Sequence, residues 1–196
     1  MKHSRSSLVV FARRPQLGAG KRRLAADIGN IGALWFQRRA ISALKRHCGT
    51  DVRWQSWMAI APDRPCSWTA PCLPVAQGRG DLGGRLARVM RAMPHGPVVV
   101  IGSDAPQVRR KDIAAAFARL RRADAVVGPS VDGGFWLIGI RRPDRCCPFG
   151  NVRWSSATTL ADVLGNLVGL KVALLQTLED VDDGASLQRL RSLRRR

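Results

Sequence analysis

The segment formed by residues 11–24 combines small residues with several cations. An apolar, strand-like run leads into it, and Gly18 and Gly20 follow in a loop. Small residues let backbone amides approach an anion closely, while Lys21 and Arg23 neutralise its charge. The spacing is neither the GxxxxGK[ST] of a P-loop nor the Rossmann GxGxxG. We expect a polyphosphate-binding loop, and the alternative is a surface turn with solvated arginines.

A second glycine-rich segment covers residues 77–86. Four glycines surround a single acid, Asp81, just before a sequence that predicts a helix. Such a loop can approach a base or a ribose closely. Asp81 is equally suited to be a plain helix N-cap, which needs no ligand. Both interpretations stay open.

The third segment, residues 102–106, places Asp104 directly after an apolar run at 98–101. In an open parallel sheet, ligands bind beyond the carboxyl ends of the strands. A carboxylate at that point suits Mg²⁺ or Mn²⁺ bridging two phosphates. Asp104 is therefore the strongest candidate for a metal ligand, and the alternative is an Asp-initiated turn before Pro106.

The fourth segment, residues 128–139, carries one carboxylate into an aromatic strand. Asp132 is suited to orient an acceptor hydroxyl or to act as a base, and Gly133 and Gly134 leave room for a sugar or a similar group. The alternative is a tight Asp-Gly hairpin turn. Trp136 fits the hydrophobic core better than a substrate platform.

An acidic cluster at residues 179–184 stands out in a chain that is otherwise strongly basic. A second metal carboxylate at Asp182 fits this cluster. Capping of the following helix by Asp182 or Asp183 is the competing interpretation.

Alternating strands and helices must position these segments. Apolar runs predict strands at 8–11, 52–60, 97–101, 125–127, 135–140 and 172–175. Helical spacing and capping residues predict helices at 31–45, 82–93, 113–122 with Asp112 as the cap, 158–166, and after Asp182 and Asp183. Residues 62–74 read as a long loop. This alternation predicts an α/β fold with a mostly parallel sheet.

Length and hydropathy indicate one globular domain over residues 1–196, with a frayed basic tail from about 190. The 196 residues are 45% hydrophobic and 24% charged, an ordinary globular composition. No apolar run is long enough to cross a bilayer, and the first apolar stretch is too short for a signal peptide. We therefore expect a cytoplasmic protein without a membrane span.

Charge and cysteine content narrow the partners further. The 33 Lys and Arg exceed the 14 Asp and Glu, giving a net charge of +19. These cations are spread along the chain without a helix-turn-helix, RRM or zinc-finger pattern, which argues against nucleic acid as the main partner. The five cysteines lack paired CxxC spacing, which argues against zinc and fits a reducing compartment: Cys48, Cys66, Cys72, Cys146 and Cys147.

In this order, the five segments resemble a bacterial family of GT-A type nucleotide-diphospho-sugar transferases, the radical-SAM-associated or arsenosugar-biosynthesis glycosyltransferases. The family pattern is FARxPxxGxxKxRL, QGxGDLGxR, GSDxP, GPxxDGGxxLIG and a DVD-type ending, and the likeness spans nearly the whole chain. More distantly it is similar to 2-phospholactate and molybdopterin guanylyltransferases. The resemblance implies a single-domain GT-A fold, a three-layer sandwich around a mostly parallel sheet.

The resemblance also implies roles for individual residues. Those expected to bind the nucleotide are Ala12, Arg13, Pro15, Gly18, Lys21, Arg23, Gln77, Gly80 and Asp81. Asp104 and Asp182 would hold Mg²⁺ or Mn²⁺, and Asp132 would face the acceptor as the catalytic residue. Those expected at the acceptor are Gly133, Gly134 and Trp136.

We expect a metal-dependent glycosyltransferase-like enzyme that moves a sugar from a nucleotide diphosphate to a small acceptor. The alternative is a nucleotidyltransferase that uses a nucleoside triphosphate and releases pyrophosphate. A third reading is a basic binding protein without catalysis. Arg22, the pair Phe135 and Trp136, and Asp183 depart from the family's commoner Thr, Tyr-Tyr and Thr. The donor base, the sugar, the acceptor and the oligomeric state stay open.

Overall fold

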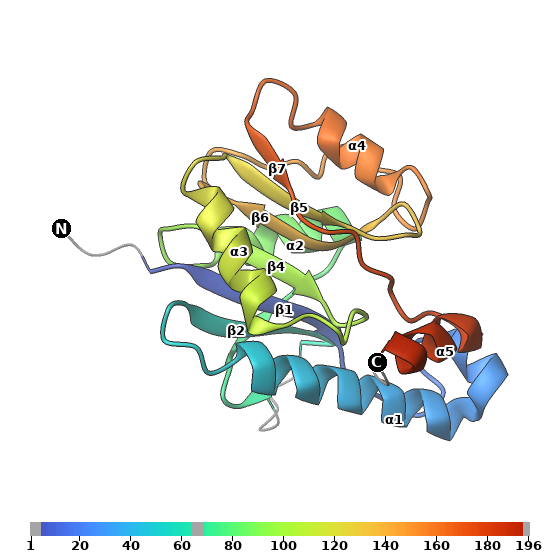
Figure 1. The fold of residues 1–196 in the computed structure, drawn as a ribbon. Coiled ribbons are helices and arrows are strands. Elements are labelled where there is room, and N and C mark those ends of the chain that lie inside the picture. The colour runs from blue at the N-terminus through green and yellow to red at the C-terminus, as the bar shows by residue number, and fades with distance from the viewer. Residues whose placement is uncertain (1–4, 64–68, 194–196) are drawn as a thin grey trace.

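A three-layer α/β architecture emerges from the computed structural model, which describes residues 5–63 and 69–193 (Figure 1). Within these residues, seven strands form one sheet: β1 (Ser7–Arg13), β2 (Gln55–Ala61), β3 (Leu73–Ala76), β4 (Val98–Gly102), β5 (Ala125–Pro129), β6 (Phe135–Ile140) and β7 (Val172–Leu174). The helices of the same residues are α1 (Arg22–Cys48), α2 (Leu82–Arg91), α3 (Arg110–Leu120), α4 (Thr159–Gly165) and α5 (Gly184–Leu193).

The sheet has the order β3-β2-β1-β4-β6-β5-β7. Only β6 among these strands runs antiparallel to its neighbours, β4 and β5, while the other pairs are parallel. The carboxyl ends of β1 and β4 therefore lie at the same edge as the start of β6. Open α/β sheets bind ligands at this kind of edge. The predicted α/β fold with a mostly parallel sheet is confirmed.

Helices cover both faces of the sheet because its central strands are apolar on both sides. Side chains of α1 and α3 pack with one face, and those of α2 and α4 with the other. Helix α5 packs on the first half of α1 through a small separate cluster that includes Leu24 and Leu187. Figure 1 shows α1 and α3 in front of the sheet and α2 behind it.

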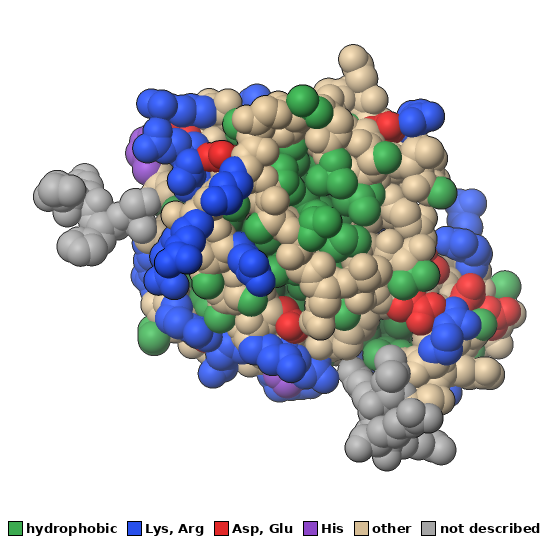
Figure 2. Space-filling model, turned by 45° about the horizontal axis from the view of Figure 1, so that its top comes forward, with side chains coloured by type: hydrophobic (Ala, Val, Ile, Leu, Met, Phe, Trp, Pro, Cys, Tyr) green, Lys and Arg blue, Asp and Glu red, His purple; other side chains and the backbone are tan. Residues whose placement is uncertain are grey.

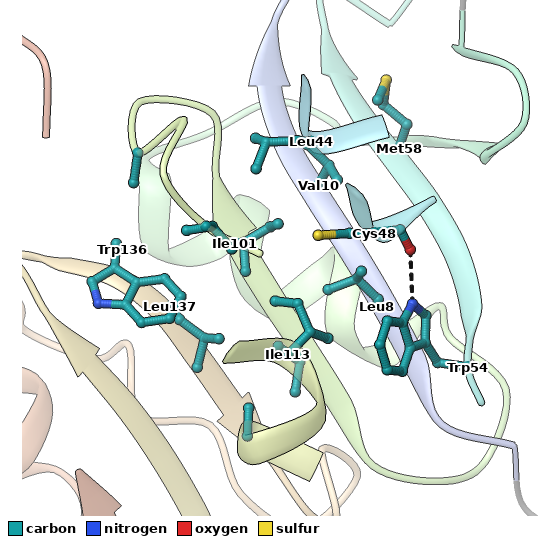
Figure 3. Close-up of a cluster of buried hydrophobic side chains, with 14 of the residues drawn as sticks. Leu8, Val10, Leu44, Cys48, Trp54, Met58, Ile101, Ile113, Trp136 and Leu137 are labelled. Atoms are coloured by element: carbon teal, nitrogen blue, oxygen red, sulfur yellow. Dashed lines mark hydrogen bonds between the residues drawn. The ribbon is translucent and has the colours of Figure 1, made fainter. Parts of the chain in front are cut away.

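The core between α1, α3 and the sheet contains aliphatic residues and two tryptophans (Figure 3). The indole nitrogen of Trp54 donates to the backbone oxygen of Cys48 at 2.9 Å, so its polar atom is satisfied inside this core. Burial raises the pKa of the Cys48 thiol to about 12, which leaves it unreactive. Cys48, Cys72, Cys146 and Cys147 are free thiols, and Cys66 lies outside the described residues.

Helix α1 begins at Arg22, well before the predicted start at residue 31. Gly29 has φ 75° and ψ 159°, so two helical segments meet at a kink, and the first lacks the apolar period of the second. Leu24 in that first segment is buried against α5, a partner that is distant in sequence. Arg22 and Arg23 therefore belong to a helix and not to the loop. At the other terminus, residues 190–193 of the expected tail lie in α5, and 194–196 lie outside the described residues.

Two other local predictions need correction. Residues 62, 63 and 69–72 lie outside the sheet, as the loop predicted at 62–74 requires, but its last two residues begin β3, an edge strand that pairs in parallel with β2. Pro74 lies in it, which an edge strand tolerates because one side of its backbone needs no partner. Asp112 is not the first cap of α3, since the helix begins at Arg110. Asp112 instead accepts from the backbone N–H of Arg109 at 2.8 Å, as the second half of a capping box.

The surface carries cations over much of its area. Figure 2 shows Lys and Arg side chains along one side of the face in view, hydrophobic side chains in the middle and acidic ones grouped at the opposite side. Within residues 5–63 and 69–193, no helix has the length and apolar character needed to span a bilayer.

Gly133, in the loop between β5 and β6, allows a close backbone approach. Its φ is 85°, and a Cβ there would lie 2.1 Å from the backbone oxygen of Ala157. We expect Gly133→Ala to lower the free energy of unfolding by about 2–3 kcal/mol, measured by chemical denaturation. Gly165→Ala is the control, because its added Cβ meets nothing within 4 Å. Equal losses in both variants would contradict this interpretation.

Candidate functional site

A cavity of about 710 Å³ opens at the carboxyl edge of β1 and β4. Its size matches a nucleotide or a similar small molecule. Its charged lining residues are Arg13, Lys21, Arg22, Arg23, Arg85, Asp104, Asp132, Asp180 and Asp182. Five cations and four carboxylates in one cavity indicate a strongly polar ligand.

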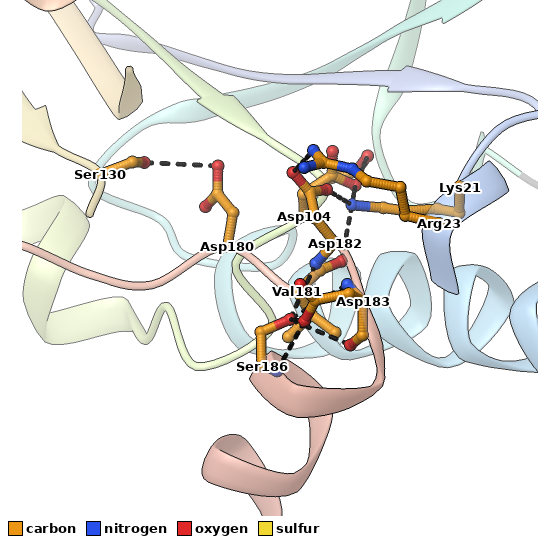
Figure 4. Close-up of polar contacts among 10 residues, drawn as sticks. Lys21, Arg23, Asp104, Ser130, Asp180, Val181, Asp182, Asp183 and Ser186 are labelled. Atoms are coloured by element: carbon orange, nitrogen blue, oxygen red, sulfur yellow. Dashed lines mark hydrogen bonds and ion pairs between the residues drawn. The ribbon is translucent and has the colours of Figure 1, made fainter. Parts of the chain in front are cut away.

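Lys21 lies at the centre of the acidic group (Figure 4). Its ammonium nitrogen is 2.7 Å from Asp182 Oδ1, 3.1 Å from Asp104 Oδ1 and 2.7 Å from the backbone oxygen of Val181. The contacts with Asp182 and Val181 are hydrogen bonds, and the contact with Asp104 is an ion pair. The side chain is only 6% exposed, and the backbone has φ 46°, a left-handed conformation that is uncommon without glycine. The glycine loop therefore positions the Lys21 ammonium next to the carboxylates of Asp104 and Asp182.

The sequence left helix capping and metal binding open for Asp182 and Asp183, and the two side chains lie differently. Asp183 precedes α5 and accepts from the backbone N–H of Ser186 at 2.8 Å, which caps the helix. Asp182 instead faces the cavity, where Arg23 Nη2 lies 3.1 Å from its second oxygen. The capping interpretation holds for Asp183, and Asp182 is available to a ligand.

Asp180 also faces the cavity, although the sequence analysis did not select it. One oxygen, Oδ2, lies 3.3 Å from Ser130 Oγ. The other, Oδ1, is buried without a hydrogen-bond partner in the described part of the chain. Burial, followed by the charges of Asp104 and Asp132, raises the pKa of Asp180 to about 7. An unpartnered carboxylate oxygen among other acids is suited to a cation.

Alternation along residues 180–182 explains why Asp180 and Asp182 both reach the cavity. Successive side chains of an extended segment point to opposite sides. Val181, between them, is 1% exposed and packs with α5, while its backbone N–H donates to the backbone oxygen of Asp104 at 3.0 Å. The D-V-D spacing was therefore the signal that pointed to Asp180.

Asp132 forms the hairpin turn of the alternative interpretation and also borders the cavity, so its role toward an acceptor stays a prediction. It lies in the loop of the β5–β6 hairpin, where its Oδ1 accepts from the backbone N–H of Gly134 at 2.9 Å. The residue is exposed and borders the cavity, as does Gly134. Gly133 is required by the approach of Ala157 and does not border the cavity.

Trp136 is a core residue, as predicted, and it also borders the cavity, so its contact with an acceptor stays a prediction. Only 1% of it is exposed, and its indole nitrogen donates to the backbone oxygen of Gln176 at 3.1 Å. A Cβ at Gly128 would lie 2.4 Å from the indole ring, so this glycine makes room for it. The aromatic residues that border the cavity are Phe11, Phe135, Trp136 and Trp154.

The residues expected at the nucleotide divide into two groups. Ala12, Arg13, Lys21, Arg23 and Gln77 border the cavity, whereas Pro15, Gly18, Gly80 and Asp81 do not. Asp81 is the N-cap of α2, accepting from the backbone N–H of Gly84 at 2.8 Å, so the helix-cap alternative accounts for it. The fully buried Gln77 amide donates to the backbone oxygens of Ala12 and Ala59, which ties β1 to β2.

The loop that carries Trp154 is held by an ion pair between its neighbour Arg153 and Asp162 on α4. Hydrogen bonds from the guanidinium, then from the backbone N–H of Arg153, lower the pKa of Asp162 to about 2. Since this folded pKa is below the ordinary 3.8, the pair stabilises the fold above pH 4 and loses its effect as the pH falls toward 2.

We therefore expect Asp162→Asn to lower the Tm at pH 7, by an amount that shrinks as the pH approaches 3. Thermal unfolding across this range measures it. Asp144→Asn is the control, because Asp144 is exposed and its ion pair with Arg145 is long, at 3.8 Å, and therefore weak. A difference between Asp162→Asn and the parent protein that stays constant with pH would contradict the assignment.

Carboxylates dominate the candidate metal ligands. Among residues 5–63 and 69–193, no three or more His, Cys, Asp or Glu side chains are grouped closely enough to hold a metal as they stand. The ammonium of Lys21 lies between Asp104 and Asp182 instead.

Comparison with known proteins identifies a family and a fold. The profile of a family described as an uncharacterized protein conserved in bacteria (DUF2064) matches residues 40–156. No curated protein matches the sequence. The crystal structure of a candidate nucleotide-diphospho-sugar transferase from Desulfovibrio desulfuricans G20 has 27% identity and a TM-score of 0.87, covering 94% of this chain and 85% of that one.

Two more distant structures share the fold alone. One is CMP:2-keto-3-deoxy-manno-octonic acid synthetase in complex with CTP, with 14% identity, a TM-score of 0.58, and 98% and 99% of the two chains covered. The other is a Mycobacterium tuberculosis H37Rv protein in complex with manganese, with 16% identity, a TM-score of 0.51, and 95% and 97% covered. The fold is thus that of nucleotide-sugar transferases and nucleotidyltransferases.

Proposed function

We propose that this chain, which belongs to the bacterial DUF2064 family, is a metal-dependent transferase that moves a sugar from a nucleotide diphosphate donor to a small acceptor. The observation that carries the proposal is the convergence of Asp104, Asp180 and Asp182 at one cavity beyond the carboxyl end of β4. The likeness to the Desulfovibrio protein supports the donor class.

The chemistry of these side chains fits a divalent cation. Carboxylate oxygens are the ligands that Mg²⁺ and Mn²⁺ prefer, and Asp180 Oδ1 is buried without a partner. The side chain of Asp104 is 45% exposed, so it is open to a ligand in the cavity. A metal held by Asp104 and Asp182 would compete with the Lys21 ammonium, because both draw on the same oxygens.

In this proposal the acceptor oxygen bonds to the anomeric carbon as the bond from that carbon to the diphosphate breaks. The bound metal would neutralise the charge that develops on the leaving diphosphate. Asp132, exposed in the hairpin loop, would accept the proton of the acceptor hydroxyl. Phe135 and Trp154, whose ring centroids are 6.4 Å apart, would shield that end of the cavity from water.

Nucleotidyl transfer is the second candidate, and the fold shared with a CTP-bound synthetase favours it. The same cavity would then hold a nucleoside triphosphate, and an acceptor phosphate would displace pyrophosphate.

Product analysis with Mn²⁺ separates the two activities. UDP-, GDP-, ADP- and CDP-sugars are compared with the matching triphosphates, with and without phosphorylated acceptors. Release of a nucleoside diphosphate from a nucleotide sugar is the expected result. Pyrophosphate release without any requirement for a nucleotide sugar would overturn the glycosyltransferase assignment. Asp144→Asn, at an exposed position, controls for general effects of lost charge.

A further inference from the structure

Arg85, on the first turns of α2, is a cavity residue to which the sequence analysis assigned no role. Its guanidinium carbon lies 5.5 Å from the centre of the Phe11 ring, and Nη2 donates to Gln77 Oε1. Its Nε is buried and has no hydrogen-bond partner among the described residues. A buried guanidinium N–H without a partner is costly unless a ligand completes it.

A second cation, Arg13 at the end of β1, borders the same part of the cavity. Within residues 5–63 and 69–193, neither Arg13 nor Arg85 forms an ion pair with a carboxylate within 4.0 Å. Burial, then the charge of Arg13, lowers the pKa of Arg85. The carboxylate of Asp63 opposes this effect, but its oxygens accept from the backbone N–H groups of Gln77 and Gly78. The charges of Arg13 and Arg85 therefore repel each other, and neither is balanced by an ion pair within the described residues.

Lys21 and Arg23, the cations expected to hold phosphates, are already engaged. The Lys21 ammonium donates to Asp182 and to the backbone oxygen of Val181, and it forms an ion pair with Asp104. Arg23 also pairs with Asp182 and is 75% exposed. An anionic ligand in this cavity therefore finds cations without an ion pair at Arg13, Arg22 and Arg85, and of these Arg85 carries a buried N–H without a partner in the described part of the chain.

The sheet order arranges the charges across the cavity. Arg13 ends β1, Asp104 follows β4, and Asp132 precedes β6, and these strands are neighbours in the order β1-β4-β6. Arg85 packs against Phe11 of β1. The arginines therefore lie on one side of the candidate metal ligands and Asp132 on the other. A ligand that carries phosphate at both the arginines and the metal must extend across β1 and β4.

We propose that Arg13 and Arg85 form an anion subsite that binds a phosphate of the nucleotide donor, so that the donor lies over β1 and the acceptor over β6. This inference rests on the proposed function for the identity of the donor. The subsite itself rests on the unpaired guanidinium groups. The phosphate oxygens would accept from Nε of Arg85, which has no other partner.

Calorimetry on the full chain with Mn²⁺ tests the subsite. The probes are UDP, GDP, ADP and CDP, the corresponding nucleosides, and pyrophosphate. Arg85→Met should weaken the binding of the tightest nucleoside diphosphate by about 10- to 100-fold, since one charge-assisted contact is lost. The affinity for the nucleoside should stay unchanged. Arg85→Lys should recover part of the lost diphosphate affinity. Arg91→Met, the same substitution at an exposed position of α2 outside the cavity, should bind like the parent protein.

Stability distinguishes this role from a purely structural one. The Tm of ligand-free Arg85→Met should stay constant or rise, because a buried N–H without a partner is removed. A lower Tm together with equal losses for nucleoside and nucleoside diphosphate would overturn the subsite, as would unchanged diphosphate affinity. Pyrophosphate binding that Arg85→Met abolishes, in a protein that binds no nucleotide, would overturn only the proposed function.

Discussion

Asp104→Asn should weaken Mn²⁺-dependent binding of the nucleotide donor by at least about 100-fold, with a similar loss of turnover. The substitution keeps the size of the side chain and removes the charge that a divalent cation requires. Asp104 lies beyond β4 with 45% of its side chain exposed, so its role toward a ligand is larger than its role in the fold. Calorimetry with and without Mn²⁺ measures the effect.

Asp132→Asn provides the contrast for this variant. Asp132 is placed on the acceptor side, so donor binding with Mn²⁺ should persist while transfer falls. Mn²⁺-dependent binding that is unchanged in Asp104→Asn would exclude Asp104 as a metal ligand and would strengthen the reading of the chain as a binding protein. Equal loss of donor binding in both variants would contradict the separation of donor and acceptor across the cavity.

Lys21→Met should destabilise the metal-free protein and make its stability depend strongly on Mn²⁺. Without the ammonium, Asp104 and Asp182 repel each other and lose their shared partner. Breaking a buried ion pair costs several kcal/mol, but these carboxylates are 45% and 33% exposed, so we expect a loss of about 1–3 kcal/mol. Mn²⁺ should then raise the Tm of the variant more than that of the parent protein, because it binds only the native state.

Arg23→Met is the matched control for Lys21→Met. Arg23 contacts the same carboxylate, Asp182, but its side chain is 75% exposed, and an exposed pair contributes little to stability. The Tm of Arg23→Met should therefore remain close to that of the parent protein. If Lys21→Met matched Arg23→Met in stability and in its response to Mn²⁺, the Lys21 ammonium would not be the group that balances the carboxylates.

The Lys21 ammonium and the proposed metal use the same oxygens of Asp104 and Asp182, so we expect one cation to replace the other there. The ammonium of Lys21 neutralises the carboxylates of the metal-free protein. A bound divalent cation would take over these oxygens and free the ammonium to face a phosphate. The predicted phosphate role of Lys21 and its observed ion pairs are then successive states of one residue, which the Mn²⁺ dependence of Lys21→Met tests.

Several elements were predictable because their causes are local. The apolar run that becomes β4 is bounded by Pro97 and Gly102, and the aromatic run of β6 follows Asp132 and its two glycines. Such runs predict strands wherever they fold. Because ligands gather beyond the carboxyl ends of strands, Asp104 could be assigned to the cavity from its position alone, and the structure places it there.

Other features could not be predicted because they depend on partners distant in sequence. The first half of α1 is supported by α5, and edge strand β3 forms only by pairing with β2. Trp136 lies in the core because Gly128, on the neighbouring strand, leaves space for its ring. Arg85 and Trp154 reach the cavity through the packing of α2 and of the loop before α4. Arg85 ends the QGxGDLGxR segment, but no local pattern shows that its side chain borders the cavity, and none marks Trp154.

The sequence by itself determined the α/β class, the main strands and the segments that carry charge. Hydrophobic period, glycine and proline act within a few residues, so these properties are readable along the chain. The tertiary structure alone decided which charges meet. It engages Lys21 with Asp104 and Asp182 and leaves Arg13 and Arg85 unpaired, because the order of strands in the sheet, a non-local property, places β1 beside β4 and Asp180 near both.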